Sequence, residues 1–73
     1  MAHNLKDIGD SVARILTDDS GYSLVYHAEV IRGKVIILDN TGQRLIPAVG
    51  GRTEKQLLKA MADWRLAHGL EVF

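Results

Sequence analysis

The sequence contains no cysteine among its 73 residues. This absence excludes disulfide bonds, and it excludes zinc or iron–sulfur sites that are held by thiolates. A chain of this length buries only about 60% of the surface that its unfolded form exposes, so small domains often depend on such cross-links. We therefore expect tight packing or association with a partner to stabilise this chain.

Long hydrophobic runs and an excess of one charge are also missing. No apolar stretch approaches the roughly 20 residues that a membrane-spanning helix needs. The first residues lack the basic and apolar regions of a secretory signal, so we expect a cytoplasmic protein with no membrane partner. Nine basic residues balance nine acidic ones, which argues against strong non-specific binding of nucleic acid.

The residues that are present have the composition of one folded domain, which we assign to residues 1–73. Apolar residues make up 47% of the chain and charged residues 25%, both ordinary values for a globular protein. The charges are unevenly distributed along the sequence. Residues 1–31 hold two basic and five acidic residues, a net of −3, whereas residues 32–73 hold seven basic and four acidic residues, a net of +3. We expect one acidic and one basic face.

Two segments have the periodicity of amphipathic helices. In residues 4–17 apolar side chains recur at intervals of three and four, and Asn4 is a suitable N-cap. The second segment begins with a capping box, in which Thr53 is the N-cap and Gln56 follows three residues later. It is predicted to run to about residue 68, where a glycine follows.

Three segments between these helices are predicted to be strands: residues 22–31, 34–38 and 43–49. The first alternates between two faces, and the second is rich in β-branched residues. Turn-forming residues at 32–33 and 39–42 separate the strands. Pro47 cannot donate to a ladder, so the third strand should lie at an edge or end there. Residues 50–52 are predicted to be a flexible connection.

The resulting order, α-β-β-β-α, predicts an α+β fold with a three-stranded antiparallel meander and two helices packed on one face. The other sheet face would then be open to solvent or to a partner. Monomers rarely expose so many apolar groups together, so we expect this face to be a binding surface or a dimer interface. A shift of one residue would reverse the two faces. Residues 70–73 are predicted either to add to the core or to form a tail. The predicted partner-binding sheet face consists of Val25, His27, Glu29, Ile31, Ile36 and Leu38.

No pattern in the sequence indicates catalysis, a metal site or a cofactor. Residues 50–51 lack the spacing of a phosphate-binding loop. His27 and Glu29 share a predicted strand face and form the only candidate acid–base pair. No serine or cysteine nucleophile lies at a recognisable spacing from them, although Ser23 shares their face. We therefore predict that the protein is not an enzyme.

Basic residues are concentrated between positions 32 and 59, where they outnumber Asp39 and Glu54. Two of them lie near the start of the second helix, where backbone N–H groups favour anions. The group is either a phosphate-binding patch or a solvated face with scattered charge. Its members are Arg32, Lys34, Arg44, Arg52, Lys55 and Lys59.

The element order is similar to that of double-stranded-RNA-binding domains and of the HicA-type toxins that share their fold. The stretch Gly42-Gln43-Arg44-Leu45-Ile46-Pro47 resembles the third strand of these toxins, and the Leu-rich second helix ending in Gly69-Leu70 is also similar. The resemblance covers residues 5–70 and implies a shared architecture. It implies no catalytic residue, because Gly21 is followed here by Tyr22-Ser23 instead of the Ser/Thr-His element of the toxins.

These observations favour a small regulatory module that binds a larger protein or complex, as phage-type inhibitors of host machinery do. The contact would be made through the exposed sheet face or through a polarised charged face. An RNA- or DNA-binding domain that uses the basic residues is the alternative. A homodimer is a further arrangement that the sequence leaves open.

Overall fold

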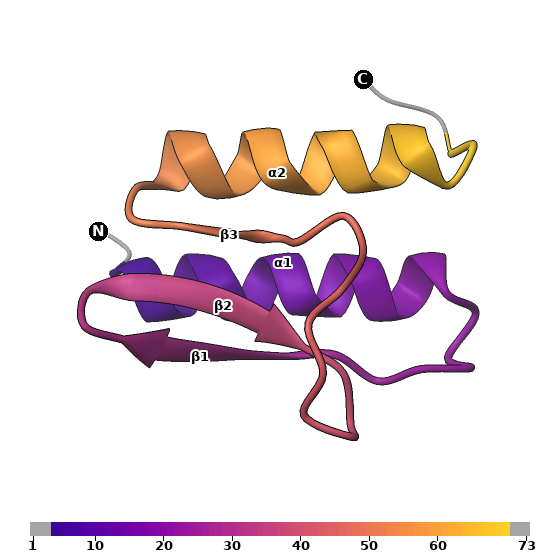
Figure 1. Ribbon diagram of the computed structural model, residues 1–73, viewed down its shortest axis with the longest axis horizontal. Helices are drawn as coiled ribbons and strands as arrows, with labels where there is room; N and C mark the ends of the chain where they lie inside the picture. Colours follow the sequence, from indigo (N-terminus) through magenta and orange to yellow (C-terminus); the bar gives the residue numbers. More distant parts are fainter. Residues whose placement is uncertain (1–3, 71–73) are drawn as a thin grey trace.

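Residues 4–70 fold into two helices and a small three-stranded antiparallel sheet (Figure 1). The computed structural model describes residues 4–70, and the predicted α+β class and the order α-β-β-β-α are confirmed there. The elements are α1 (Leu5–Asp19), β1 (His27–Ile31), β2 (Lys34–Leu38), β3 (Gly50–Gly51) and α2 (Glu54–Ala67).

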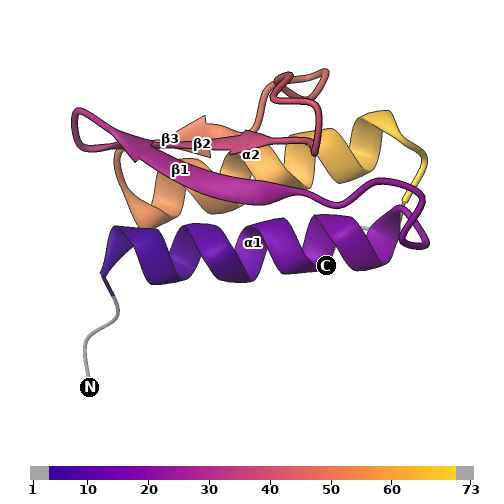
Figure 2. The ribbon, with the colours of Figure 1, turned by 90° about the horizontal axis from the view of Figure 1, so that it is seen from below.

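The two helices lie side by side and contact different strands. Helix α1 packs against β1 and β2, whereas α2 packs against β3 and against α1. Figure 2 shows α1 on one side of the sheet and the loop between β2 and β3 rising on the other side. Within residues 4–70, the sheet face opposite α1 has no helix over it.

Both helices begin at the predicted N-caps. Asn4 Oδ1 accepts a hydrogen bond from Asp7 N at 2.8 Å, and Thr53 Oγ1 accepts one from Gln56 N at 3.2 Å. Gln56 Oε1 reaches back to accept from Arg52 N at 2.8 Å. These contacts satisfy backbone N–H groups that have no partner inside a helix, so short-range sequence signals determine both starts.

Strands β1 and β2 form a hairpin that is closed by two residues with positive φ. Arg32 has φ +53° and Gly33 has φ +75°, the backbone of the two-residue turn that matches the twist of paired strands. The register that follows from this turn pairs His27 with Leu38, Glu29 with Ile36 and Ile31 with Lys34. Because the side-chain period of a strand is two, these three pairs share one face of the hairpin.

The core lies between this hairpin and the helices. A close approach of α1 to the sheet occurs at Gly9, where a Cβ atom would lie 2.9 Å from Val35 Cγ1 and 3.1 Å from Ala28 Cβ. Leu70 is partly buried against the core, and residues 71–73 lie outside the described part of the chain. The buried apolar residues are Val12, Ala13, Leu16, Tyr26, Ala28, Val35, Ile37, Leu45, Val49, Leu57 and Trp64.

The first strand is shorter than the predicted residues 22–31, because β1 begins at His27. Tyr22, which was predicted to open this strand, has φ +64° and is 69% exposed, so it belongs to the turn after α1. Ser20 Oγ donates to Leu24 O, and Tyr26 N donates to Thr17 Oγ1 at 2.9 Å. The backbone before β1 is therefore held by the end of α1 and not by β2.

The third strand also differs from the prediction of residues 43–49. Only an isolated bridge between Leu38 and Arg44 occurs there, and β3 is formed by Gly50 and Gly51, which were predicted to be a flexible connection. At Gly50 a Cβ atom would lie 2.5 Å from Val35 O. The chain therefore comes close enough to pair with β2 at a residue that has no side chain, and not along the segment that ends at Pro47.

Candidate functional site

The sheet face opposite α1 carries five of the six side chains predicted for it. We call this surface the open face and define it by His27, Glu29, Ile31, Ile36 and Leu38. Ile31 is 50% exposed, and Ile36 and Leu38 are each partly buried. The apolar side chains lie beside polar ones in the β1–β2 register, so the open face mixes both kinds of group.

Val25, the sixth predicted residue, precedes β1. It is 54% exposed and lines a hollow of about 350 Å³ between α1 and the start of β1. Asp10 and Arg14 of α1 and Tyr22 line the same hollow. The structure therefore places Val25 beside α1, before the first paired residue of the open face, His27, which lines the same hollow.

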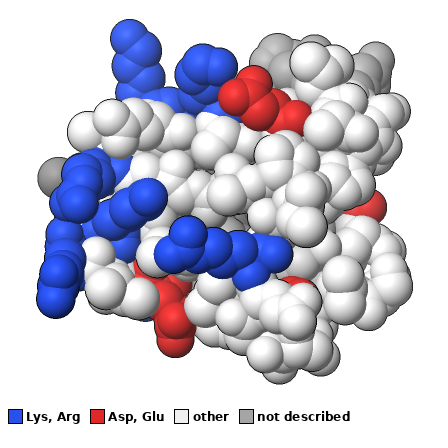
Figure 3. All heavy atoms as spheres, in the orientation of Figure 1, with Lys and Arg blue, Asp and Glu red and all other residues white. Residues whose placement is uncertain are grey.

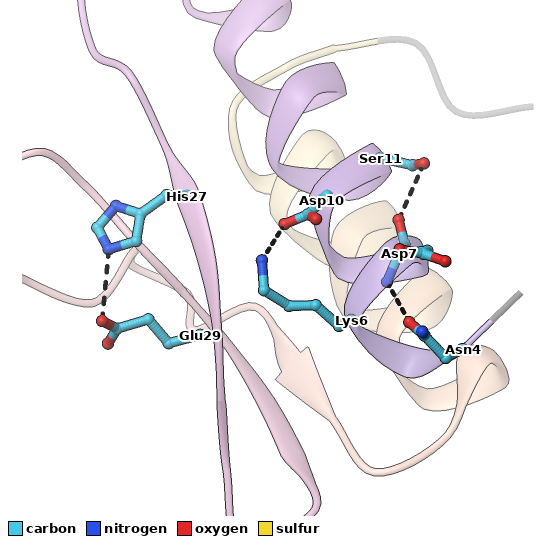
Figure 4. Close-up of polar contacts among 7 residues, drawn as sticks. All are labelled: Asn4, Lys6, Asp7, Asp10, Ser11, His27 and Glu29. Carbon is cyan, nitrogen blue, oxygen red and sulfur yellow. Dashed lines mark hydrogen bonds and ion pairs between the residues drawn. The ribbon is translucent and has the colours of Figure 1, made fainter.

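His27 and Glu29 point away from α1 (Figure 4). His27 Nε2 and Glu29 Oε1 are 3.9 Å apart, and the side chains are 49% and 50% exposed. This separation is longer than a hydrogen bond, and an exposed pair of this kind has little energetic weight. Ser23 Oγ donates to Ser20 O in the turn after α1 and does not join the pair. His27 and Glu29 are therefore two solvent-exposed polar groups, and Ser23 does not provide a nucleophile beside them.

The predicted basic residues divide into three groups, of which the first joins two segments far apart in the sequence. Arg52 Nη1 donates to Arg32 O at 2.9 Å, so the connection between β3 and α2 is fastened to the β1–β2 turn. Figure 3 shows Lys and Arg side chains gathered at the left of the view, over this turn and the start of α2. Two guanidinium groups therefore belong to one end of the molecule.

The second group is Lys34 and Arg44, which together line a hollow that is distinct from the one beside Val25. This hollow has a volume of about 90 Å³, and its other lining residues are Ile36, Ile37, Ala48, Val49 and Gly50. Lys34 comes from β2, and Arg44 comes from the loop that forms a bridge to Leu38. Cations from two segments thus border a small depression beside the open face.

The third group lies on α2. Lys55 is in the first turn of the helix, and Lys59 Nζ forms an ion pair with Asp63 Oδ2 at 3.2 Å. Lys59 therefore belongs to a solvated helix surface. None of the ion pairs between residues 4 and 70 involves the other five predicted basic residues.

Acidic side chains gather on α1. Asp7, Asp10 and Asp18 are exposed there, and Asp10 pairs with Lys6 of the same helix (Figure 4). Basic residues lie at the β1–β2 turn and at the β3–α2 connection instead. The two charge signs that the sequence separates along the chain are thus carried largely by different elements.

The part of the chain that the structure describes contains neither a metal-binding cluster nor a membrane-spanning helix. Across residues 4–70, no three His, Asp or Glu side chains come together in a way that could hold a metal ion. Neither helix in this range has the length and apolar content to cross a bilayer.

The sequence did not indicate the hollow between Lys34 and Arg44. The loop that brings Arg44 beside Lys34 has no local pattern that specifies its path, and the bridge from Leu38 to Arg44 is a tertiary contact.

Comparison of the chain with protein-family models, with curated proteins and with solved structures found no match.

Proposed function

We propose that the protein is a non-enzymatic module that binds a larger protein through the open face. The observation that carries this proposal is the row of partly exposed apolar side chains on a sheet face that no described helix covers: Ile31, Ile36 and Leu38. Apolar groups clustered within a polar surround are typical of protein-binding surfaces.

The energetics of such a contact are favourable for a module this small. Complete burial of an exposed Ile or Leu contributes roughly 1.5–3 kcal/mol, and half of that remains where the side chain is already half-buried. The hairpin that presents these side chains is held by its turn and by α1, so little backbone order is lost on binding. A partner that also satisfies the charged neighbours would gain specificity.

Binding of RNA or DNA is the second candidate function. It is favoured by the five basic residues that take no part in the ion pairs of residues 4–70: Arg32, Lys34, Arg44, Arg52 and Lys55. Two other features are less suitable for nucleic acid. Tyr26 and Trp64 are buried against each other, with ring centroids 6.2 Å apart, and are not available to stack on bases. The acidic surface of α1 would repel phosphates.

The experiment that tests the proposal is affinity capture from an extract of the source cells, with and without nuclease. We expect a protein complex to be retained by the wild-type chain and lost with Ile31→Asp or Ile36→Asp. The matched control is Leu66→Asp, because Leu66 is 68% exposed on α2 and lies outside the open face. Circular dichroism and thermal unfolding establish that each variant is folded.

Two outcomes would contradict the proposal. Retention that is equal for Ile31→Asp, Ile36→Asp and Leu66→Asp would remove the open face as the binding surface. Retention that disappears on nuclease treatment, and with Arg44→Glu or Arg52→Glu, would favour the second candidate.

A further inference from the structure

We infer that the hollow between Lys34 and Arg44 binds a carboxylate of the protein partner, within an acidic segment that also places an apolar side chain on the open face. This inference rests on the proposed function and adds the chemistry of the partner. The hollow adjoins the open face because Ile36 belongs to both. A single partner segment can therefore occupy the two together.

The size of the hollow suits a small charged group. A volume of about 90 Å³ holds a few water molecules, and hence a group of the size of a carboxylate. The recognised group is therefore the end of an Asp or Glu side chain or the terminal carboxylate of a chain.

Charge makes the hollow selective for an anion. Neither Lys34 nor Arg44 takes part in an ion pair among residues 4–70. No acidic residue lines the hollow, and the nearby Asp39 accepts a hydrogen bond at Oδ1 from Thr41 N at 2.8 Å. Lys34 supplies a point charge, and the planar guanidinium of Arg44 can donate two parallel hydrogen bonds to one carboxylate.

The apolar lining of the hollow strengthens this interaction. Ile36, Ala48 and Val49 border the two cations, so a bound carboxylate is partly removed from water, where its attraction to a cation is less screened. Exposed ion pairs on α2, such as Lys59–Asp63, lack such a lining and are weak.

The backbone holds the hollow in place before a partner arrives. Ile37 N donates to Val49 O at 3.0 Å, and Leu38 bridges to Arg44. A Cβ atom at Gly50 would collide with Val35 O, so close pairing of β3 with β2 shapes one wall. Little ordering of the backbone is therefore needed on binding.

The spacing along β2 specifies the pattern expected in the partner. The side chains of Lys34, Ile36 and Leu38 follow one another on the same face of the strand. Residues two apart in an extended chain are separated by about 6.6 Å. An extended partner segment with an acidic residue beside Lys34 therefore places the side chain two positions along over Ile36 and the one four positions along over Leu38. We expect the pattern Asp/Glu, any residue, then a large apolar residue.

The first step of the test is a selection from a phage-displayed library of random 12-residue peptides against the tagged full-length chain. Peptides that bind the wild-type protein should be enriched in the acidic–any–apolar pattern. A synthetic peptide carrying the selected sequence is then titrated against variants and followed by fluorescence anisotropy.

The variants separate the hollow from general electrostatics. Lys34→Gln/Arg44→Gln should weaken binding of the peptide about tenfold or more, because it removes the charge-assisted hydrogen bonds to the carboxylate. Lys55→Gln/Lys59→Gln is the matched control, because it also removes two positive charges but both lie outside the hollow, and it should leave the affinity unchanged. Replacing the acidic residue of the peptide by Gln should reproduce the loss on the wild-type protein and have little effect on the double variant.

Each other outcome overturns the inference. If the selected peptides lack acidic residues, or bind Lys34→Gln/Arg44→Gln as well as wild type, the hollow is not the carboxylate site. The proposed function then stands if Ile31→Asp still abolishes binding. If no selected peptide depends on either the hollow or the open face, both proposals fail. A 20-nucleotide single-stranded DNA or a 20-base-pair RNA duplex that binds through Arg44 when no peptide does would assign the hollow to phosphate instead.

Discussion

Arg65 of α2 donates from Nε to Asp19 Oδ2 at the end of α1, across 2.9 Å, and the two side chains are only 19% and 15% exposed. The pair joins residues 46 positions apart in the sequence. Asp19 is the last residue of α1, where the helix dipole is unfavourable for a negative charge, and the last turn of α1 contains no basic residue. Arg65 supplies that missing cation from the neighbouring helix.

Removal of one partner of this pair should destabilise the fold. We expect Arg65→Leu to lower the free energy of unfolding by about 1–3 kcal/mol, because it leaves the Asp19 carboxylate mostly buried with no cation beside it. Urea unfolding at neutral pH measures the loss. Combining Arg65→Leu with Asp19→Asn in a double-mutant cycle should give a positive coupling energy.

The exposed pair Lys59–Asp63 on α2 is the comparison for this prediction. Lys59→Ala should change the stability by less than about 0.5 kcal/mol, because such surface pairs have little effect. Equal effects of Lys59→Ala and Arg65→Leu would show that the Arg65–Asp19 contact has no special role.

The hydroxyl of Thr17 connects α1 to the start of β1. Thr17 Oγ1 donates to Ala13 O at 2.8 Å and accepts from Tyr26 N at 2.9 Å, inside the protein. Thr17→Val keeps the shape of the side chain but leaves the N–H of Tyr26 without a partner, so we expect a loss of about 1–3 kcal/mol in urea unfolding. Thr17→Ser keeps the hydroxyl and should retain the bond to Tyr26 N. A Thr17→Val protein as stable as wild type would contradict this role.

Gly9 is a glycine that the packing of α1 on the sheet requires. In an exposed helix Gly→Ala normally stabilises by about 1 kcal/mol. Here the added methyl group would collide with Val35 Cγ1 at 2.9 Å, and Val35 is fully buried. We expect Gly9→Ala to destabilise by about 1–3 kcal/mol. Ser11→Ala, at an exposed position of the same helix, is the control and should be neutral or slightly stabilising; a stabilising Gly9→Ala would show that α1 can shift freely.

The turn after β2 should respond to acid. Hydrogen bonds lower the pKa of Asp39 below its ordinary value of 3.8; the largest effect comes from the Thr41 side chain, and the next from the backbone N–H of Gln43. A lowered pKa means that the charged form favours the fold. The contribution is therefore complete above pH 3.8 and is lost as the pH falls through the lower pKa of the folded state.

A carboxyl-detected NMR titration measures this pKa directly. We expect the Asp39 signal to titrate below 3.8, and we expect Thr41→Ala to move it upward, because that substitution removes the hydroxyl that donates to Asp39 Oδ1 at 2.6 Å. A midpoint at or above 3.8 would contradict the hydrogen-bonded turn.

Local signals account for the parts of the fold that were predicted correctly. Asn4 and Thr53 cap the helices through residues three positions away, and the turn at residues 32–33 sets the β1–β2 register without help from the rest of the chain. That register and the strand period of two show which side chains share a face of the hairpin, and the packing of α1 decides which face is covered. The caps and the turn depend on neighbours in sequence, so a single chain reveals them.

Contacts between distant residues decided the rest. The pairing of Gly50 with β2 depends on close approach to Val35 O, and the late start of the first strand, at His27, depends on the bond from Tyr26 N to Thr17. The hollow at Lys34 and Arg44 and the Arg65–Asp19 pair likewise exist only once the elements are packed. Turns and helix caps were therefore determined by the sequence alone, because their energies are local. The candidate binding hollow was decided by tertiary structure, because its two cations are brought together by the path of a loop that has no periodic pattern.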